Sequence, residues 1–227
     1  MEQKRYAVAV DGPSGAGKST LARAVARELD ITYVDTGAIY RVVALAALRR
    51  GVGPEDGPAV AALLPELSVA LRHGDDGEQR MYLNGEDVSA DIRLPEVSMY
   101  ASAVSALPAV RAYLLEMQRR FARERSVIMD GRDIGTVVLP DAAVKIFLTA
   151  DAEVRARRRG LELEQRGTPK PYAEVLAELR QRDWNDSHRA IAPLKQAADA
   201  VLLDTSALDF EQSKALMLKT IRERAGL

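Results

Sequence analysis

A glycine-rich segment near the start of the sequence has the residue types that bind phosphate. It fits the pattern G-x-x-x-x-G-K-[ST] and, with the threonine that follows, comprises Gly12, Pro13, Ser14, Gly15, Ala16, Gly17, Lys18, Ser19 and Thr20. Glycines let successive backbone N–H groups point into one concavity, and the start of a following helix adds positive charge. Lys18 can reach the terminal phosphates, and Ser19 can offer its hydroxyl to Mg²⁺. The segment therefore predicts a binding site for a nucleoside triphosphate and its Mg²⁺.

Two aspartates are placed to assist the metal ion. Asp11 stands directly before the glycine-rich segment, and Asp130 ends an apolar run much later in the chain. Either carboxylate could hold a water molecule bound to Mg²⁺. For Asp11 a second interpretation, a carboxylate that only braces the loop, is equally open.

A second anion site is indicated by the segment Asp35-Thr36-Gly37-Ala38-Ile39-Tyr40-Arg41. Here a short strand gives way to a helix, and Arg41 lies about one turn along from Gly37, so helix amides and a guanidinium could meet on one phosphate. The alternative is structural: Asp35 or Thr36 caps the helix and the arginine is solvated.

Two sets of charged residues in the second half of the chain each fall on one face of an expected helix. In the first helix the spacing is i, i+3, i+4, and the residues are Arg155, Arg158 and Arg159. In the second helix the spacing is i, i+4, i+7, and the residues are Arg182, Asp186 and Arg189. The first set also has glutamates at i,i+4 spacing, which is typical of an exposed helix face, so both a phosphate-binding and a surface role remain open. The break at 166–169 could hinge the two helices as a lid.

Short apolar runs alternate with helical patterns around these motifs. We expect strands at 6–10, 32–34, 126–129, 144–148 and 200–203, and helices at 18–29, 36–50, 95–106, 108–125, from 152, at 172–188 and at the end of the chain. Strands that alternate with helices favour an α/β fold with a mostly parallel central sheet covered by helices on both faces. The stretch 68–93 differs, because its alternating residues and its Asn84-Gly85 turn predict a small antiparallel insertion.

Composition excludes several classes of protein. The 227 residues include no cysteine, so a disulfide scaffold, a cysteine nucleophile and a thiolate metal site are ruled out. Hydrophobic residues at 47% and charged residues at 29% are normal for a globular protein with a core. A net charge of -1 provides no overall field for nucleic acid or an anionic membrane. No apolar run reaches the ~18 residues of a membrane span, and the first residues lack a leader pattern, so we expect a cytoplasmic protein. We also expect it to be a monomer.

A nucleotide site alone could belong to a kinase, a guanine-nucleotide switch or a motor. The sequence has neither the Asn-Lys-x-Asp motif that reads guanine nor the Leu-Ser-Gly-Gly-Gln motif of a motor. The remaining feature is a set of arginines at turns between strands and helices. Their positions favour transfer of a phosphoryl group to a second anion.

The motifs, taken in order, resemble those of the bacterial cytidylate kinases, which are nucleoside monophosphate kinases of the P-loop class. The resemblance rests on segments 12–20, 35–41 and 131–138, the insertion at 68–93, the arginines at 155–159 and the series Arg182-Asp183-x-x-Asp186-x-x-Arg189, followed by Ala192-Pro193-Leu194. It implies a three-layer P-loop kinase fold in one kinase domain, 1–227. Within that domain it implies a core at about 5–35, 107–152 and 190–227, a nucleoside monophosphate (NMP)-binding region with the β insertion at about 36–106, and a helical lid at about 153–189.

The same resemblance assigns residues to the acceptor CMP, and dCMP with it. They are Thr36, Arg41 and Arg132 at the phosphate, Ser102, Arg111 and Asp133 at the cytosine edge, and Asp186 near the ribose. Cytosine presents an amino donor where uracil presents an oxygen, so a carboxylate such as that of Asp133 would favour CMP over UMP.

On the donor side, the resemblance implies that ATP is bound by the glycine-rich segment and by Arg158, with Mg²⁺ as the metal. Lys18, Arg132, Arg182 and Arg189 are the expected catalytic residues, because they neutralise charge on the transferring group. A phosphate acceptor is already anionic, so no general base is required. The alternatives are a kinase for UMP or for a shikimate-like alcohol, in which Asp35 could act as base, and a nucleotide-binding module without catalysis.

Overall fold

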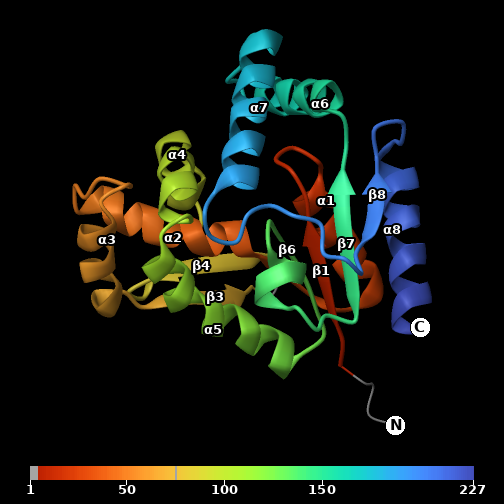
Figure 1. Cartoon of the computed structure of the whole chain (residues 1–227), viewed down its shortest axis with the longest axis horizontal. Coiled ribbons are helices and arrows are strands. Elements are labelled where there is room, and N and C mark those ends of the chain that lie inside the picture. Colours follow the sequence, from red (N-terminus) through yellow and green to blue (C-terminus); the bar gives the residue numbers. More distant parts are fainter. Residues whose placement is uncertain (1–4, 75) are drawn as a thin grey trace. The chain divides into compact units, whose positions relative to one another are not determined.

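The structure is a computed structural model that describes residues 5–74 and 76–227. Its residues form two compact units (Figure 1). Unit 1 consists of the N-terminal segment up to Tyr33 together with Ala122–Leu227, and unit 2 is Val34–Phe121. No helix in residues 5–74 and 76–227 is long and apolar enough to cross a membrane.

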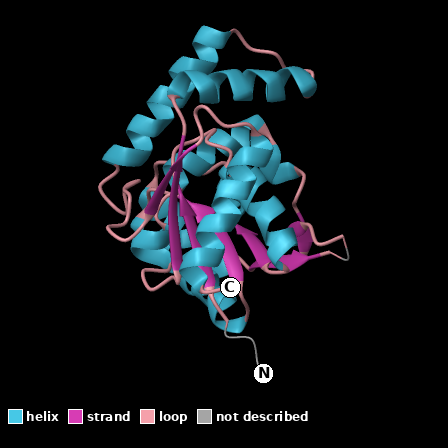
Figure 2. Cartoon of the chain, turned by 90° about the vertical axis from the view of Figure 1, so that its right-hand side faces the viewer, coloured by secondary structure: helices cyan, strands magenta, loops and turns pink. Residues whose placement is uncertain are grey.

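Unit 1 is built on a parallel sheet with the strand order β2-β6-β1-β7-β8. All strands of the chain are drawn in magenta in Figure 2. The strands of this sheet are β1 (Ala7–Asp11), β6 (Val127–Gly131), β7 (Val144–Thr149), β8 (Val201–Asp204) and β2 (Thr32–Asp35), which begins in unit 1. The β1–β6, β1–β7 and β7–β8 pairs are all parallel. Since parallel neighbours need crossover connections, helices separate these strands in the sequence. The mostly parallel sheet predicted from the sequence is confirmed.

Helices α1 (Lys18–Leu29) and α8 (Phe210–Ala225) share an apolar core with the sheet of unit 1. Val8, Val10 and Ile128 alternate along their strands with residues that point to the other face, and all three belong to this core. The alternation fixes which face of the sheet each strand residue reaches, and this decides where the polar residues at the strand ends lie.

Two further helices, α6 (Ala152–Gln165) and α7 (Tyr172–His188), pack on each other in unit 1. They have an apolar cluster of their own, formed by Ala156, Val175 and Leu179. Figure 1 shows α6 starting directly above the end of β7. The bounds of α7 agree with the expected 172–188.

A short π-helix, η3 (Ile134–Val138), follows β6 and was not expected from the sequence. The amide of Leu139 donates to the carbonyl oxygen of Ile134 at 2.7 Å, five residues back. A single π turn has no repeating side-chain pattern, so hydrophobic periodicity does not reveal it.

Unit 2 combines helices with a three-stranded antiparallel sheet of order β3-β4-β5. Its elements are α2 (Thr36–Arg49), α3 (Gly57–Leu63), η1 (Leu64–Glu66), β3 (Val69–His73), β4 (Gln79–Leu83), β5 (Glu86–Asp87), η2 (Asp91–Arg93), α4 (Pro95–Val104) and α5 (Pro108–Glu124), which begins in this unit. The antiparallel insertion predicted at 68–93 is confirmed. Helix α2 is apolar over most of its surface and packs against α4 and the small sheet, which buries it.

The backbone at Gly12 predicts a sharp contrast between two glycine substitutions in unit 1. A Cβ at Gly12 would stand 1.9 Å from the carbonyl oxygen of Leu148, on the neighbouring strand. A Cβ at Gly160, inside α6, would meet nothing within 4 Å. We expect Gly12→Ala to lower the free energy of unfolding by about 3 kcal/mol or more, whereas Gly160→Ala should raise it by about 0.5–1 kcal/mol. Denaturant titration measures both, and equal effects of the two changes would contradict this packing.

Candidate functional site

The loop 12–17 joins β1 to α1 and turns the backbone toward the start of the helix. Gly15 and Gly17 have φ angles of 74° and 86°, in the left-handed region that glycine adopts at low cost. Gly17 is the N-cap of α1 and makes no side-chain capping bond, so the first amides of the helix are not covered by a side chain at the N-cap. The strand, loop and helix expected around the phosphate-binding pattern are therefore present.

Lys18 is the first residue of α1 and is 6% exposed. Its Nζ donates to the carbonyl oxygen of Pro13 at 2.8 Å, across the loop. Burial, with further contributions from Arg132 and Arg182, lowers the pKa of Lys18 to about 7, against the opposing pull of Asp130 and Asp11. A bound polyanion would reverse this balance, so the position favours a phosphate ligand.

Asp11 is the last residue of β1 and Asp130 the last but one of the neighbouring β6, and their side chains point to opposite faces of the sheet. Asp130 is paired with Val10, and Asp11 with Gly131. Residues two apart share a face, so Asp130 points to the same side as Ile128, where α1 packs, and Asp11 points away from it.

The hydrogen bonds of the two aspartates follow from this geometry. Oδ2 of Asp130 accepts from the hydroxyl of Ser19 at 2.7 Å, and Oδ1 accepts from the hydroxyl of Tyr33 at 3.0 Å. The two oxygens of Asp11 instead accept from the amides of Ile134 and Gly135, each at 2.8 Å. Asp130 therefore lies beside the expected metal-binding hydroxyl, whereas Asp11 braces the start of η3.

Burial also raises the pKa of Asp11 to about 6, although its two amide bonds pull the pKa in the other direction. Asp133 contributes to the increase and Lys18 opposes it. The carboxylate is 4% exposed. Asp11 is therefore a structural carboxylate whose pKa lies only slightly below neutral pH.

The oxygen donors at the head of α1 suit Mg²⁺. The Ser19 hydroxyl and the Asp130 carboxylate are hard ligands, 2.7 Å apart. The part of the chain that the structure describes contains no cluster of three or more histidines, cysteines or carboxylates able to form a cage for a metal ion. This composition fits Mg²⁺, which commonly takes one or two protein ligands and completes its shell with phosphate and water.

Residues of the 131–138 motif pair with residues of α7 and of the turn after it. Arg132 Nε donates to Oδ2 of Asp186 at 2.6 Å, and Arg189 Nη2 donates to Oδ1 of Asp133 at 3.2 Å. Burial alone would raise the pKa of Asp186, but Arg132, followed by Arg182 and Arg189, holds it below its usual value. Five of the predicted site residues thus interact with one another in unit 1.

The arginines of α6 separate into different environments. Arg158, expected at the triphosphate, donates to the carbonyl oxygens of Thr205 at 2.7 Å and Leu208 at 3.2 Å, in the loop after β8. Arg159 is half-buried and pairs with Glu162 at 2.9 Å. Arg155 is 5% exposed and reaches the phosphate loop, where it donates to the carbonyl oxygen of Ser14 at 2.8 Å.

Asp183 is a contact residue that the sequence analysis did not assign. Its Oδ2 pairs with Nη1 of Arg155 at 2.7 Å, and its Oδ1 accepts from the amide of Ser14 at 3.3 Å. The only sequence signal was its place directly after Arg182, within the motif of α7.

In unit 2, Asp35 caps α2, as one of the two interpretations of this segment proposed. Its Oδ1 accepts from the amide of Ala38 at 3.0 Å. Gln79 on β4 holds the backbone of Asp35 through two hydrogen bonds, one to the amide at 2.8 Å and one to the carbonyl oxygen at 3.2 Å. Thr36 is buried at the first position of the helix, and Arg41 is half-buried one turn later. Carboxylate and amide side chains thus fix the helix start on which the expected second anion site depends.

Arg111 and Ser102 are linked through Ser105 in the same unit. Nη1 of Arg111 donates to the carbonyl oxygen of Ser105 at 3.1 Å, and the Ser105 hydroxyl donates to the carbonyl oxygen of Ser102 at 2.9 Å. The Arg111 guanidinium also lies 5.6 Å from the ring centroid of Tyr40. Ser102 and Arg111, two of the three residues expected at the cytosine edge, are therefore neighbours, and Arg111 is buried.

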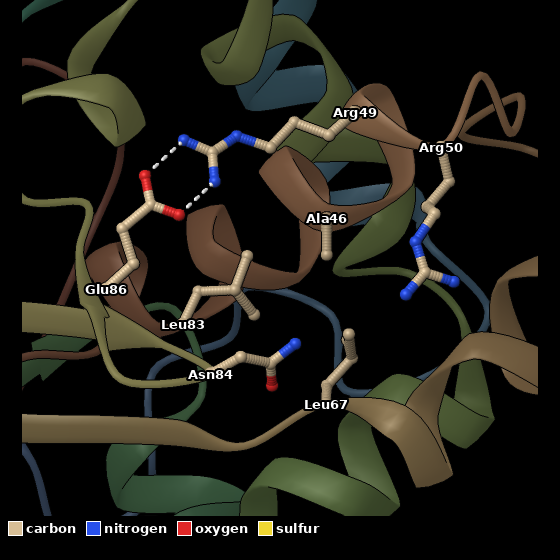
Figure 3. Close-up of a pocket in the computed structure, with 7 residues that line it drawn as sticks. All are labelled: Ala46, Arg49, Arg50, Leu67, Leu83, Asn84 and Glu86. Carbon is tan, nitrogen blue, oxygen red and sulfur yellow. Dashed lines mark hydrogen bonds and ion pairs between the residues drawn. The ribbon is translucent and has the colours of Figure 1, made fainter.

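A pocket of about 170 Å³ in unit 2 lies apart from these residues (Figure 3). Its lining consists of Ala46, Arg49, Arg50, Leu67, Leu83, Asn84 and Glu86. Both guanidinium groups are paired, Arg49 with Glu86 at 2.7 Å and Arg50 with Glu66 at 2.9 Å. None of the predicted site residues lines this pocket.

Comparison with known proteins agrees with this geometry. A family model for cytidylate kinase matches residues 8–223. A cytidylate kinase of Pasteurella multocida (strain Pm70) is 48% identical over 223 residues and covers 98% of both chains. One of Citrifermentans bemidjiense is 50% identical over 218 residues, covering 96% of this chain and 93% of its own.

Among solved structures, a gluconokinase from Sinorhizobium meliloti 1021 has the same fold, with a TM-score of 0.51 at 14% identity. The match covers 98% of this chain and 96% of that chain. At this level of identity the likeness concerns the fold alone, and it confirms the predicted P-loop kinase architecture. Because the family model and the two relatives extend over nearly all of its length, this chain belongs to the cytidylate kinase family.

Proposed function

We propose that the protein transfers the γ-phosphoryl group of ATP, as its Mg²⁺ complex, to the phosphate of CMP and of dCMP. The observation that carries the proposal is the environment of Lys18: a buried ammonium at the head of a helix, with Arg132 and Arg182 close enough to lower its pKa. Such a concentration of positive charge suits two polyanionic nucleotides that must approach each other. Family membership supports a nucleoside monophosphate as the acceptor.

On the donor side, the glycine-rich loop and the first amides of α1 hold the phosphates, and Lys18 neutralises the terminal ones. Mg²⁺, held by the Ser19 hydroxyl with Asp130 beside it, would offset the negative charge of the phosphate oxygens. Arg182 and Arg189 act on the transferring group. Arg158 is also among the residues that bind ATP in this proposal.

On the acceptor side, the attacking oxygen belongs to a phosphate that is already anionic near neutral pH. No side chain need remove a proton, so alignment and charge neutralisation account for catalysis. Arg132 supplies positive charge, and its 2.6 Å contact with Asp186 fixes the direction of its guanidinium. Asp133 accepts from the amino group of cytosine, and Asp186 lies near the ribose.

The roles of the unit 2 residues in this proposal come from the motifs around them. Thr36 and Arg41 bind the acceptor phosphate, and Ser102 and Arg111 bind the cytosine edge. The division into a core, an NMP-binding region and a lid belongs to the same proposal, as do a monomeric state and a cytoplasmic location.

A coupled assay of ADP release tests the reaction against its alternatives. We expect rapid release with CMP and dCMP, about ten- to a hundredfold slower release with UMP, and background release with AMP and shikimate. ADP release that does not depend on an acceptor, or faster release with shikimate than with CMP, would overturn the proposal.

The low pKa of Lys18 predicts that ATP binding takes up a proton. Above pH 7 the Lys18 side chain of the free protein is mostly the neutral amine. The bound triphosphate raises its pKa, so about one proton should be taken up per ATP at pH 8. Affinity should fall by up to about tenfold per pH unit above 7. Calorimetry in buffers of different ionisation enthalpy measures the uptake. Lys18→Arg, which does not titrate, is the control, and equal uptake by both proteins would refute the assignment.

The two aspartates should respond differently to the same substitution. Asp130→Asn should raise the Mg²⁺ concentration needed for half-maximal activity by about tenfold or more, because it removes the negative charge beside the Ser19 hydroxyl. Asp11→Asn should leave that concentration within about twofold but lower the free energy of unfolding by about 1–3 kcal/mol, because one backbone amide loses its acceptor. Mg²⁺ titrations and denaturation curves of both variants separate the roles. A reversed pattern would exchange them.

Removal of the Asp133 carboxylate should weaken CMP binding far more than ATP binding. We expect Asp133→Ala to raise KM for CMP by about tenfold or more, while KM for ATP changes by about twofold or less. Asp141→Ala, at an exposed carboxylate, serves as the control and should change neither constant. Equal increases in both constants would remove Asp133 from base recognition.

A further inference from the structure

Ser14, in the middle of the phosphate-binding loop, is held at both ends of its backbone by residues of the two lid helices. Its carbonyl oxygen accepts from Nη1 of Arg155 on α6 at 2.8 Å, and its amide donates to Oδ1 of Asp183 on α7 at 3.3 Å. The two side chains also form an ion pair with each other at 2.7 Å. The three residues therefore form a closed triangle of contacts.

Arg155 connects this triangle to the central sheet as well. Its Nε donates to the carbonyl oxygen of Ala150, just after the end of β7, at 2.7 Å. One guanidinium thus contacts the end of a core strand, the phosphate loop and α7. Only a planar fork of several donors can satisfy acceptors in different directions at once, and lysine lacks this geometry.

The contact is buried and closely packed. Arg155 is 5% exposed, in contrast to the half-buried Arg159 one turn along the same helix, whose side chain is 39% exposed. A Cβ at Gly15 would lie 3.5 Å from Cβ of Arg155 and 3.5 Å from a methyl carbon of Leu179, so the loop rests directly on both helices. Leu179 belongs to the apolar cluster that joins α6 to α7. The phosphate loop and the two helices are therefore in direct packing contact.

We propose that Arg155 and Asp183 are a pair of positioning residues that couples occupancy of the phosphate loop to the placement of α7. Asp183 is flanked in the sequence by Arg182, and Asp186 lies one turn further along the same helix. The position of Ser14 thereby sets where Arg182 and Asp186 lie relative to Lys18 and Arg132. This inference rests on the proposed function, because it concerns the loop and the lid that the reaction uses.

The chain offers a matched control pair between the same two helices. Arg180 of α7 pairs with Glu153 of α6 at 2.6 Å, and the two side chains are 61% and 45% exposed. The hydrogen bonds of this pair stay within the two helices, whereas those of Arg155 and Asp183 extend to the phosphate loop. A purely structural role in holding α6 to α7 would give the two pairs similar effects.

Trp184 provides a direct readout of α7 that does not depend on catalysis. It is the one tryptophan of the sequence, follows Asp183 directly and stacks on His188 with ring centroids 3.5 Å apart. Its emission therefore reports on the environment of α7. ATP binding can be followed in parallel by calorimetry, with no acceptor present.

The experiment compares the wild-type protein with Arg155→Lys, Asp183→Asn and the control Arg180→Lys. In the wild type and the control, we expect ATP to change the Trp184 emission. In the two test variants, the emission change per bound ATP should fall by more than half, and KM for ATP should rise by about tenfold. The double variant should cost less than the product of the two single effects.

The proposal is overturned if the test variants keep the full emission change, or if Arg180→Lys loses it equally. Should Arg155→Lys fail to fold, Asp183→Asn decides alone, because it keeps an oxygen to accept from Ser14 and loses only the charge of the pair. A wild-type protein that shows the emission change but no CMP phosphorylation would contradict the proposed function and leave the coupling intact.

Discussion

The site depends on keeping a positively charged lysine where little water can reach it. Lys18 loses hydration on folding, and the nearby Arg132 and Arg182 add repulsion, so its pKa falls to about 7 despite the carboxylates of Asp130 and Asp11. The carboxylates near the start of α1 thus do not fully balance the positive charge around Lys18. A triphosphate supplies that charge, and the loop backbone supplies the hydrogen bonds. Because these groups are in place before the ligand arrives, little reorganisation is needed when charge develops during transfer.

The sheet distributes the carboxylates around this cation by a simple rule. Asp11 and Asp130 lie near the carboxyl ends of neighbouring parallel strands, one residue out of register, and the twofold alternation of strand side chains sends them to opposite faces. One carboxylate meets Ser19 of α1, and the other meets backbone amides of η3. A shift of one residue in the pairing would exchange the faces. The register of the β1–β6 pair therefore determines which carboxylate can serve a metal ion and which one holds the backbone.

Much of this architecture could be predicted from local patterns. Apolar runs and helical periodicity located the strands and helices to within about two residues, because such patterns arise from burial of one face of an element. The glycine-rich pattern identified the loop at Lys18 because the residue types that bind phosphate are consecutive in the sequence. The contacts of Gln79 with Asp35, and the π-helix η3, could not be predicted. The first joins residues that are far apart in the sequence, and the second has no side-chain period.

The pairing of Arg155 with Ser14 shows why part of a site can escape sequence analysis even when its motif is obvious. The pattern of the phosphate loop leaves the residue at Ser14 unspecified, because its contacts with the lid use the backbone amide and carbonyl groups. Any residue other than proline provides both groups, so this position carries no signal. The information lies instead in Arg155 and Asp183, which stand among many arginines and acids with no pattern that links them. Burial distinguishes Arg155 from the half-buried Arg159. Burial of this kind is decided by the packing of α6 on the loop rather than by the periodicity of α6 itself.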